Sequence, residues 1–269
     1  NLLTEAGIET VLYDGNEALN KEEIKQRVKH PVEVILGELT DEMIEAFDLM
    51  VLSPGISVNA PFVQKFKEHK IPVWSEIELA YYFSRGEIAA ITGTNGKTTT
   101  TALVGEIVKC QYDSSFVVGN IGIPYTNVAL DTKEESVIVA EISSFQLETI
   151  QQFRPKVSAV LNITPDHLDR HGTVECYADT KLKIAMNQTE SEYCVLNYDD
   201  PTTRAMGMRI KAVPVYFSRL EKLEKGVYLD GDDFVISWNG TRQVICTMQD
   251  INLLGGHNHE NILAAIAIS

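Results

Sequence analysis

The stretch IAAITGTNGKTTTT at residues 88–101 decides how the rest of the chain is interpreted. Residues 88–92 form an apolar run of the kind that makes a buried strand of a parallel sheet, and helical spacing begins at Lys97. Glycines at positions 93 and 96 lie between the two. This order of strand, glycine turn and helix presents backbone N–H groups to an oligophosphate at the N-terminus of a helix. The stretch therefore predicts a nucleotide triphosphate site.

The side chains of the turn are those that such a site needs. The glycines let the backbone approach the phosphates, Lys97 can neutralise the β/γ oxygens, and the Thr98 hydroxyl can ligate Mg²⁺. We predict nucleotide contacts for Gly93, Thr94, Asn95, Gly96, Lys97, Thr98 and Thr99. The spacing G-x-x-G-K-T is about two residues shorter than the general pattern G-x-x-x-x-G-K-[ST], so the alternative is a glycine-rich turn with an incidental lysine.

Bulk composition excludes several classes of protein. The 269 residues, 44% of them hydrophobic, suffice for two domains of an ordinary soluble protein. The net charge of −15 argues against a general nucleic-acid binder, because no broad basic surface is available. No apolar stretch approaches the ~20 residues needed to span a bilayer, so we expect no membrane insertion. The four scattered cysteines lack metal-like pairing and favour a reduced cytoplasmic setting.

Strand and helix patterns alternate in the first third of the chain, and this alternation predicts a parallel sheet with helices packed on it. A boundary at residues 84–87 divides the chain into domains 1–84 and 85–269. In the first domain we predict strands at 10–13, 32–36, 49–53 and 72–74, and helices at 17–29, 41–47 and 60–69.

The second domain shows the same alternation, followed by a different pattern. Strands are predicted at 88–92, 116–119, 137–142, 158–163 and 193–197, and helices at 97–109, 174–187 and 201–208. From residue 213 onward, short strands with Asp-Gly and Asn-Gly turns predict β-hairpins in an antiparallel sheet beside the parallel one. The sequence begins and ends inside helical patterns, so we expect it to be a fragment.

Acidic residues and histidines follow two further predicted strands. Glu141 comes directly after an apolar strand, at the edge where open α/β sheets bind ligands, and is a candidate Mg²⁺ ligand. The alternative is a glutamate that caps a helix or forms an ion pair. Residues 166–171, DHLDRH, form a cluster around His167 that is able to bind a metal ion or a phosphate oxygen. The alternatives are a structural histidine, as a lone histidine usually is, and an Asp166 that caps the turn.

Four weaker features complete the candidates. Lys181 lies on the predicted helix 174–187, where composition alone favours a solvated surface lysine. Asn120 lies in a tight turn after a strand and presents an amide. The turn SPGIS at residues 53–57 offers N–H groups suited to a diphosphate, or is simply a βα turn. Asn258 and Asn261 lie on one helical face, where they could read an adenine edge, unless Asn258 merely caps the helix.

Taken together, these stretches resemble the muramyl (Mur) ligase family over essentially the whole chain. GTNGKTTT, GNIGIP, EISSFQLE, NITPDHLDRHG, the Lys181 helix and GGHNHEN follow the family's order, and the short glycine spacing is the form that this family uses. EISSFQLE and SPGI most resemble the branch that adds D-glutamate. The implied fold is a Rossmann-like, UDP-substrate-binding N-terminal domain and a P-loop central ATPase domain, which combines a mostly parallel sheet with a smaller antiparallel one.

The resemblance implies a cytoplasmic, ATP-dependent, ADP-forming amide ligase of peptidoglycan synthesis, expected to be a monomer. It would activate UDP-N-acetylmuramoyl-L-alanine as an acyl phosphate, which the amine of D-glutamate then attacks. The catalytic residues would be Lys97, His167 and Lys181.

The implied ligands of the site residues follow the same resemblance. Thr98 and Glu141 would hold one Mg²⁺, His167 would bind a second, and Lys181 would be carbamylated and so become a carboxylate-like metal ligand. Asn120 and Ser143 would lie near the substrate, and Asn258 and Asn261 near adenine. Uridine and diphosphate would face Asp14, Ser53, Pro54 and Gly55.

The resemblance also implies missing parts and leaves competitors. A first strand with its glycine turn would precede Asn1, and a C-terminal amino-acid-binding domain would follow Ser269, so we expect this chain alone not to complete ligation. Competing interpretations are another muramyl ligase or a folylpolyglutamate synthetase-like ligase, and a nucleotide-binding module that hydrolyses ATP without an acceptor. A dinucleotide-binding oxidoreductase ranks last because the chain contains no G-x-G-x-x-G pattern.

Overall fold

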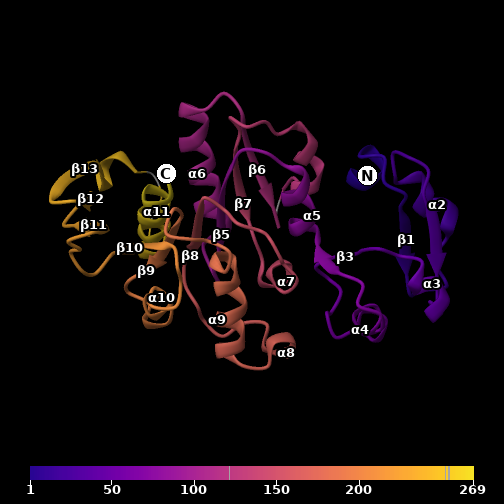
Figure 1. The fold of residues 1–269 in the computed structure, drawn as a ribbon. Coiled ribbons are helices and arrows are strands. Elements are labelled where there is room, and N and C mark those ends of the chain that lie inside the picture. Colours follow the sequence, from indigo (N-terminus) through magenta and orange to yellow (C-terminus); the bar gives the residue numbers. More distant parts are fainter. Residues whose placement is uncertain (121, 252, 254) are drawn as a thin grey trace. The chain divides into compact units, whose positions relative to one another are not determined.

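The computed structural model describes residues 1–120, 122–251, 253 and 255–269. The chain divides into two compact units, Asn1–Glu76 and Ile77–Ser269 (Figure 1). This division comes earlier in the chain than the boundary expected at residues 84–87. The difference is helix α5 (Glu76–Phe83), which was not predicted and which is hydrogen-bonded to the second unit. The buried carboxylate of Glu78 accepts hydrogen bonds from the N–H groups of residues 151–153, at 2.6–3.0 Å.

The first unit alternates strands and helices as predicted, but its strands form two small sheets where one was expected. Strand β1 (Val11–Asp14) pairs in parallel with β2 (Glu33–Leu36), and β3 (Met50–Leu52) pairs in parallel with β4 (Val73–Ser75). Side chains of β1 and β3 line a common cavity, and among the described residues no ladder joins these two strands. The helices are α1 (Leu2–Glu5), α2 (Lys21–Gln26), α3 (Asp41–Glu45) and α4 (Pro61–Glu68).

Local sequence explains the helix boundaries of the first unit. Asn20 caps α2 by accepting a hydrogen bond from the N–H of Glu22, which starts this helix later than position 17. Thr40 caps α3 in the same way. Helix α4 begins with Pro61, whose missing N–H costs nothing at a first helical position. Its buried side chains, Val63 and Phe66, pack in a core with residues of α3, β3 and β4.

The second unit is built on one nine-stranded sheet in the order β13-β12-β11-β10-β9-β8-β5-β7-β6. The strands from β6 to β11 in this order are parallel, and β12 and β13 return antiparallel. Their bounds are β5 (Glu87–Thr92), β6 (Ser115–Gly119), β7 (Val137–Glu141), β8 (Val157–Val160), β9 (Tyr193–Asn197), β10 (Val213–Ser218), β11 (Gly226–Asp230), β12 (Asp233–Trp238) and β13 (Thr241–Thr247).

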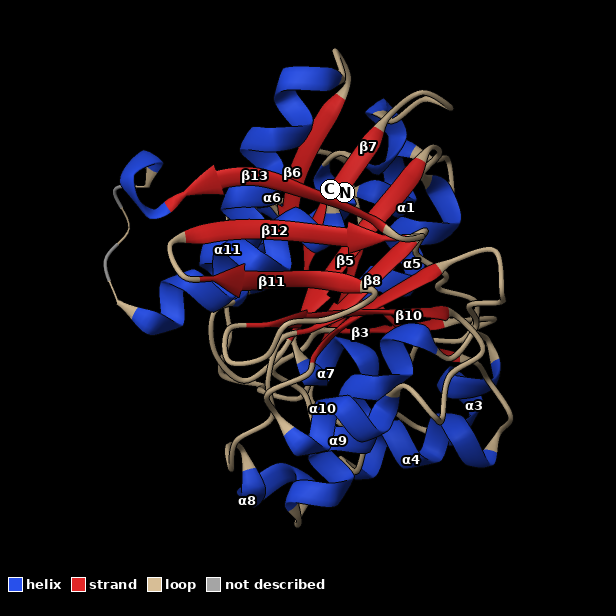
Figure 2. Ribbon diagram, turned by 90° about the vertical axis from the view of Figure 1, so that its left-hand side faces the viewer, coloured by secondary structure: helices blue, strands red, loops and turns tan. Residues whose placement is uncertain are grey.

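The predicted hairpins are present, but they do not make a separate sheet. Strand β10 pairs in parallel with β9, and β11 pairs in parallel with β10, so the antiparallel strands continue the main sheet (Figure 2). Asn239 and Gly240 join β12 to β13 with φ angles of 52° and 79°. Positive φ at both central residues is the conformation that Asn-Gly favours in a two-residue hairpin.

Helices α6 (Lys97–Gln111) and α11 (Gly256–Ile268) share a core with the sheet. Val104 and Val108 of α6 pack there with Leu263 and Ala264 of α11 and with buried residues of the central strands. The other helices are α7 (Ser144–Leu147), α8 (Leu168–His171), α9 (Val174–Leu182) and α10 (Pro201–Met206), with short 3₁₀ turns η1 (Tyr125–Asn127), η2 (Ala129–Asp131), η3 (Lys183–Ala185) and η4 (Met248–Asp250). The predicted helix 174–187 is thus α9 followed by η3.

None of the helices in the described part of the chain combines the length and the apolar character needed to cross a bilayer.

Candidate nucleotide-binding site

The phosphate loop, which we define as residues 93–98, connects the carboxyl end of β5 to the N-terminus of α6, as the sequence predicts. Gly96 precedes the first turn of this 15-residue helix and has φ 85°, a left-handed conformation that glycine adopts without strain. Within the described residues, the N–H groups of residues 96–99 have no acceptor. Four uncommitted donors at the positive end of a helix make an anion site.

The main-chain donors of the two preceding residues are already committed. The N–H of Thr94 donates to the carbonyl oxygen of Asn162 at 3.0 Å. The N–H of Asn95 donates to the side-chain oxygen of Asn162 at 2.8 Å. Of the seven residues predicted to contact nucleotide, therefore, the four at positions 96–99 offer free main-chain donors.

Lys97 folds back over the loop. Its ammonium group donates to the carbonyl oxygens of Gly93 and Thr94 at 3.0 and 2.9 Å. Burial lowers the pKa of Lys97, while the charges of Glu141 and Asp166 oppose this shift. A partly desolvated cation beside free N–H groups is a strong attractor for phosphate oxygens.

Glu141, the last residue of β7, meets the loop because β7 is a neighbour of β5 in the sheet. Its carboxylate is 2% exposed and accepts hydrogen bonds from the Thr98 hydroxyl at 2.9 Å and from the Asn120 amide at 3.2 Å. A hydroxyl and a carboxylate are the hard oxygen ligands that Mg²⁺ prefers, so these residues fit a metal bound with the phosphates. No group of three or more His, Cys, Asp or Glu in the described residues could hold a metal ion by itself.

Lys181 of α9 lies beneath the loop with 1% exposure. It donates to the Gly93 carbonyl oxygen at 2.8 Å and to the Thr92 hydroxyl at 3.3 Å, and its ammonium lies 4.7 Å from the centre of the Tyr177 ring. Burial, with repulsion from Lys97, lowers its pKa to about 7. The surface position that composition favoured for Lys181 is therefore wrong, because the side chain is buried against the phosphate loop.

His167 precedes α8 with φ 50° and a half-exposed side chain. Its ring lies 5.0 Å from that of Phe145 and 6.4 Å from that of Tyr177, the ring that Lys181 also contacts. The Asp166 carboxylate accepts the N–H of the adjacent His167 at 2.9 Å. His167 occupies the N-cap position of α8 and no side chain of the described residues caps this helix, so the capping role considered for Asp166 is not seen.

Two other residues of the predicted cluster, Arg170 and His171, form contacts with α7 and the residue that follows it. Arg170 forms a two-point ion pair with Glu148, with its Nε 3.0 Å from Oε1 and its Nη2 2.5 Å from Oε2. His171 shares a hydrogen bond of 3.0 Å with the Ser144 hydroxyl. Burial lowers the pKa of His171, and the neighbouring Glu148 opposes the shift. These contacts fix α8 against α7.

The remaining predicted residues of this unit have mixed surroundings. Ser143 caps α7, because its hydroxyl accepts the N–H of Gln146 and donates to the Gln146 side chain. Asn261 is 6% exposed, accepts from the Thr100 hydroxyl at 3.4 Å and donates to the Asn258 side chain at 3.3 Å. Capping of α11 by Asn258 is wrong, since Gly255 occupies the N-cap position.

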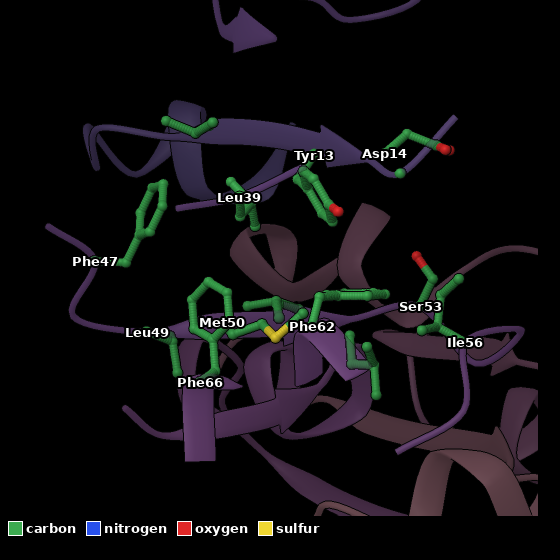
Figure 3. Close-up of a pocket in the computed structure, with 14 residues that line it drawn as sticks. Tyr13, Asp14, Leu39, Phe47, Leu49, Met50, Ser53, Ile56, Phe62 and Phe66 are labelled. Carbon is green, nitrogen blue, oxygen red and sulfur yellow. The ribbon is translucent and has the colours of Figure 1, made fainter. Parts of the chain in front are cut away.

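The first unit holds a cavity of about 180 Å³ between its two small sheets (Figure 3). Asp14 and Ser53 both line it, near one end, together with apolar and aromatic side chains of β1, β3 and α4. The Tyr13 hydroxyl in the lining donates to the carbonyl oxygen of Gly37 at 2.9 Å. Pro54 and Gly55 follow Ser53 in the chain but do not line the cavity.

Sequence reasoning missed two residues of the site, Asn162 and Tyr177. Asn162 follows β8 directly, and the end of a parallel strand beside the phosphate loop is where ligand sites form in such sheets. That position was the available signal. No sequence signal marks Tyr177 as a site residue, because an aromatic residue on a helix is usually part of the core.

The chain is an α/β protein with a mostly parallel sheet, and a glycine turn with free N–H donors at the carboxyl edge of such a sheet is the arrangement that nucleotide-binding proteins use. Comparison with known families gives the class more closely. The Mur ligase middle domain matches residues 91–269, and the MurD-like N-terminal domain of Mur ligases matches residues 1–75. The chain belongs to the Mur ligase family.

Its relatives are similar over the whole chain. It is 48% identical over 270 residues to the UDP-N-acetylmuramoylalanine--D-glutamate ligase of Lachnoclostridium phytofermentans, and all of this chain is covered. It is 49% identical over 271 residues to the protein of the same name from Lachnospira eligens. The chain spans 60% of the length of each relative.

Solved structures of the family share the fold. The UDP-N-acetylmuramate:L-alanyl-gamma-D-glutamyl-meso-diaminopimelate ligase of Neisseria meningitides superposes with a TM-score of 0.59 at 17% identity, covering 99% of this chain and 86% of that one. MurF from Acinetobacter baumannii gives a TM-score of 0.55 at 14% identity, covering 98% and 51%. At such identities the likeness establishes the α/β fold with its mostly parallel sheet and nothing about substrate.

Proposed function

We propose that the protein containing this chain joins D-glutamate to UDP-N-acetylmuramoyl-L-alanine in peptidoglycan synthesis, with conversion of ATP to ADP and phosphate. The observation that carries the proposal is the meeting of Thr98, Glu141 and Lys181 at one phosphate loop. The two relatives of about 48% identity carry the name of this activity. We further propose that the protein acts as a monomer in the cytoplasm.

The reaction requires positioning and charge stabilisation more than covalent chemistry from the protein. The γ-phosphoryl group of ATP moves to the alanyl carboxylate and ADP leaves. The amine of D-glutamate attacks the resulting acyl phosphate, loses a proton, and displaces inorganic phosphate as the amide forms. Lys97 and the free N–H groups of residues 96–99 stabilise the charge on the phosphates.

Thr98 and Glu141 are the residues that would hold a Mg²⁺ ion bound with the nucleotide. When bound, the ion neutralises phosphate charge and aligns the phosphoryl oxygens. A second ion would be held by His167, and Lys181 is proposed as a further metal ligand. The hydroxyl and carboxylate already in contact at 2.9 Å support the first position.

Lys181 is proposed to be carbamylated. A neutral amine attacks CO₂, forms the N–C bond and releases a proton, so a lysine that is neutral near pH 7 reacts where an ordinary lysine does not. The lowered pKa of about 7 and the adjacent Lys97 cation support this, because the product is an anion. A carbamate supplies oxygen ligands where an ammonium cannot.

The two units are assigned separate ligands. We propose that the first unit, residues 1–76, forms a Rossmann-like domain whose cavity takes the uridine nucleotide, with Asp14 and Ser53 in its lining and Pro54 and Gly55 toward the diphosphate. The second unit, residues 77–269, forms the P-loop ATPase domain. There Asn120 and Ser143 face the substrate, and Asn258 and Asn261 lie toward adenine.

The test is phosphate release by the full-length protein with ATP, Mg²⁺ and UDP-N-acetylmuramoyl-L-alanine. D-glutamate, L-lysine and meso-diaminopimelate are offered in turn. Release that requires D-glutamate is the expected result. Release with another amine would keep the ligase and change its substrate, and ATP turnover indifferent to every amine would overturn the ligase proposal.

A further inference from the structure

The segment that follows β8, residues 161–164, contacts the phosphate loop along its length. The side chain of Asn162 makes a two-point contact with the main chain of Asn95. Its oxygen accepts the Asn95 N–H at 2.8 Å, and its amide donates to the Asn95 carbonyl oxygen at 3.0 Å. The carboxamide thus bonds the loop as the main chain of a neighbouring strand would.

Thr94 is bound to the same segment. Its N–H donates to the Asn162 carbonyl oxygen at 3.0 Å, and its hydroxyl accepts the Thr164 N–H at 3.0 Å. Gly93 packs just as closely, since a Cβ atom on it would lie 3.0 Å from Cβ of Leu161. The first half of the loop is therefore held by the protein, which leaves the N–H groups of residues 96–99 for a ligand.

The segment is in turn held from the β9–α10 connection. Asp200 accepts the N–H of Ile163 at 2.7 Å with one carboxylate oxygen. With the other it caps α10 by accepting the N–H groups of Thr202 and Thr203 at 2.8 and 3.3 Å. The buried amide of Asn197 donates to the Leu161 carbonyl oxygen at 3.1 Å.

We propose that Asn162 is a positioning residue of the phosphate loop and that Asp200 acts on the loop by fixing the main chain around Asn162. The inference rests on the proposed binding of ATP. Asn162 need not touch the nucleotide. It fixes the loop in one shape before the ligand arrives, so that less ordering remains to be done on binding.

The test compares Asn162→Ala with a matched variant, Asn187→Ala, in the full-length protein. The Asn187 amide also makes two hydrogen bonds to main-chain carbonyl oxygens, those of Gln151 and Phe153, at 2.9 and 3.0 Å, but these lie away from the loop. Dissociation constants for MgATP and MgADP are measured by calorimetry, and stability by urea denaturation. We expect Asn162→Ala to weaken both nucleotides about tenfold, as the loss of one to two net hydrogen bonds predicts. Asn187→Ala should lower stability similarly and leave nucleotide binding unchanged.

Two further variants separate positioning from general destabilisation. Asp200→Ser keeps a good helix cap but is too short to reach Ile163, so it should weaken nucleotide binding while the urea midpoint stays close to that of the wild type. Asn162→Asp keeps the acceptor for Asn95 N–H and places an anion against the Asn95 carbonyl oxygen, so it should also weaken binding if Asn162→Ala fails to fold. In each, the KM for ATP should rise while the KM for D-glutamate does not.

Unchanged nucleotide affinity in folded Asn162→Ala or Asn162→Asp would overturn the inference, and so would an equal loss in Asn187→Ala. Failure of the wild-type protein to bind either nucleotide would contradict the proposed function instead, so the two failures are distinguishable.

Discussion

The Thr98 hydroxyl donates a hydrogen bond of 2.9 Å to Oε2 of Glu141, which joins the first turn of α6 to the carboxyl end of β7. The other carboxylate oxygen accepts from Asn120 at 3.2 Å. The Glu141 carboxylate is buried, and each of its oxygens accepts a hydrogen bond from a neutral donor. The pair is therefore arranged to receive a cation together with the phosphates.

Replacing Thr98 by Val removes one proposed metal ligand and keeps the shape of the side chain. We expect the apparent affinity for Mg²⁺, titrated in the presence of ADP, to fall about tenfold or more. ADP binding without Mg²⁺ should change much less, because the N–H groups of residues 96–99 are retained. Thr99→Val is the control. Thr99 lies on the same helical turn, so this variant reports any loss that comes from placing valine in the helix. An equal loss of Mg²⁺ affinity in both variants would contradict the metal role of Thr98.

Lys181 gives the chain a specific dependence of stability on pH. Its pKa is lowered from 10.5 to about 7, by burial first and by Lys97 second. Between pH 7 and 10.5 the unfolded chain holds a proton on this lysine that the folded chain lacks, so stability rises with pH in that window. Lys181→Met removes this rise. We therefore expect the variant to be more stable relative to the wild type near pH 7 than near pH 9.5, while ligation is lost.

Urea denaturation at the two pH values, in buffers kept free of CO₂ so that Lys181 remains an unmodified amine, measures this difference. Lys211→Met, at an exposed position, is the control and should show no such change. A difference between Lys181→Met and the wild type that is the same at both pH values would show that Lys181 keeps its proton in the folded protein.

The sequence predicted those elements of the fold that depend on residues close together in the chain. The β5–loop–α6 unit follows from apolar periodicity and glycines, and the hairpins follow from Asp-Gly and Asn-Gly turns. The order of strands in the sheet was not predictable, since it depends on which buried strands meet. Helix α5 was missed for a similar reason: its key contact joins Glu78 to residues 151–153, far along the chain.

The residues of the candidate site also fall into those that the sequence predicted and those that it did not. Lys97 and Thr98 were predicted from spacing, and Glu141 from its place after a strand. Lys181 looked like any helical lysine, because only the packing of α9 beneath the loop desolvates it. Asn162 was overlooked although it follows a strand, because the hydrogen bonds to Asn95 that define its role join two segments 67 residues apart in the sequence.

Gly96 is expected to tolerate no side chain. Its φ of 85° disfavours other residues, and a Cβ atom would lie 2.2 Å from Oδ1 of the buried Asn261. Gly231, in the β11–β12 hairpin, has φ 61° with nothing near its missing Cβ, so Gly231→Ala measures the backbone strain alone, about 1 kcal/mol. Gly96→Ala should cost more than this in urea denaturation and should also weaken nucleotide binding. Adding Asn261→Ala to Gly96→Ala should recover part of the stability, and a purely additive double variant would contradict the clash.

Glu78→Gln tests how the second unit is held together apart from its ligand site. The Glu78 carboxylate is 1% exposed and accepts three main-chain N–H groups, from Gln151, Gln152 and Phe153. Glutamine offers one oxygen, and its amide would face N–H donors, so we expect a loss of about 2–3 kcal/mol in the free energy of unfolding. The exposed Glu221→Gln is the control and should change stability little.

Saturating MgATP should increase the free energy of unfolding of Glu78→Gln and of the wild type by a similar amount, because the nucleotide binds elsewhere on the folded unit. A much smaller rise for Glu78→Gln would mean that the contact supports the nucleotide site as well as the fold.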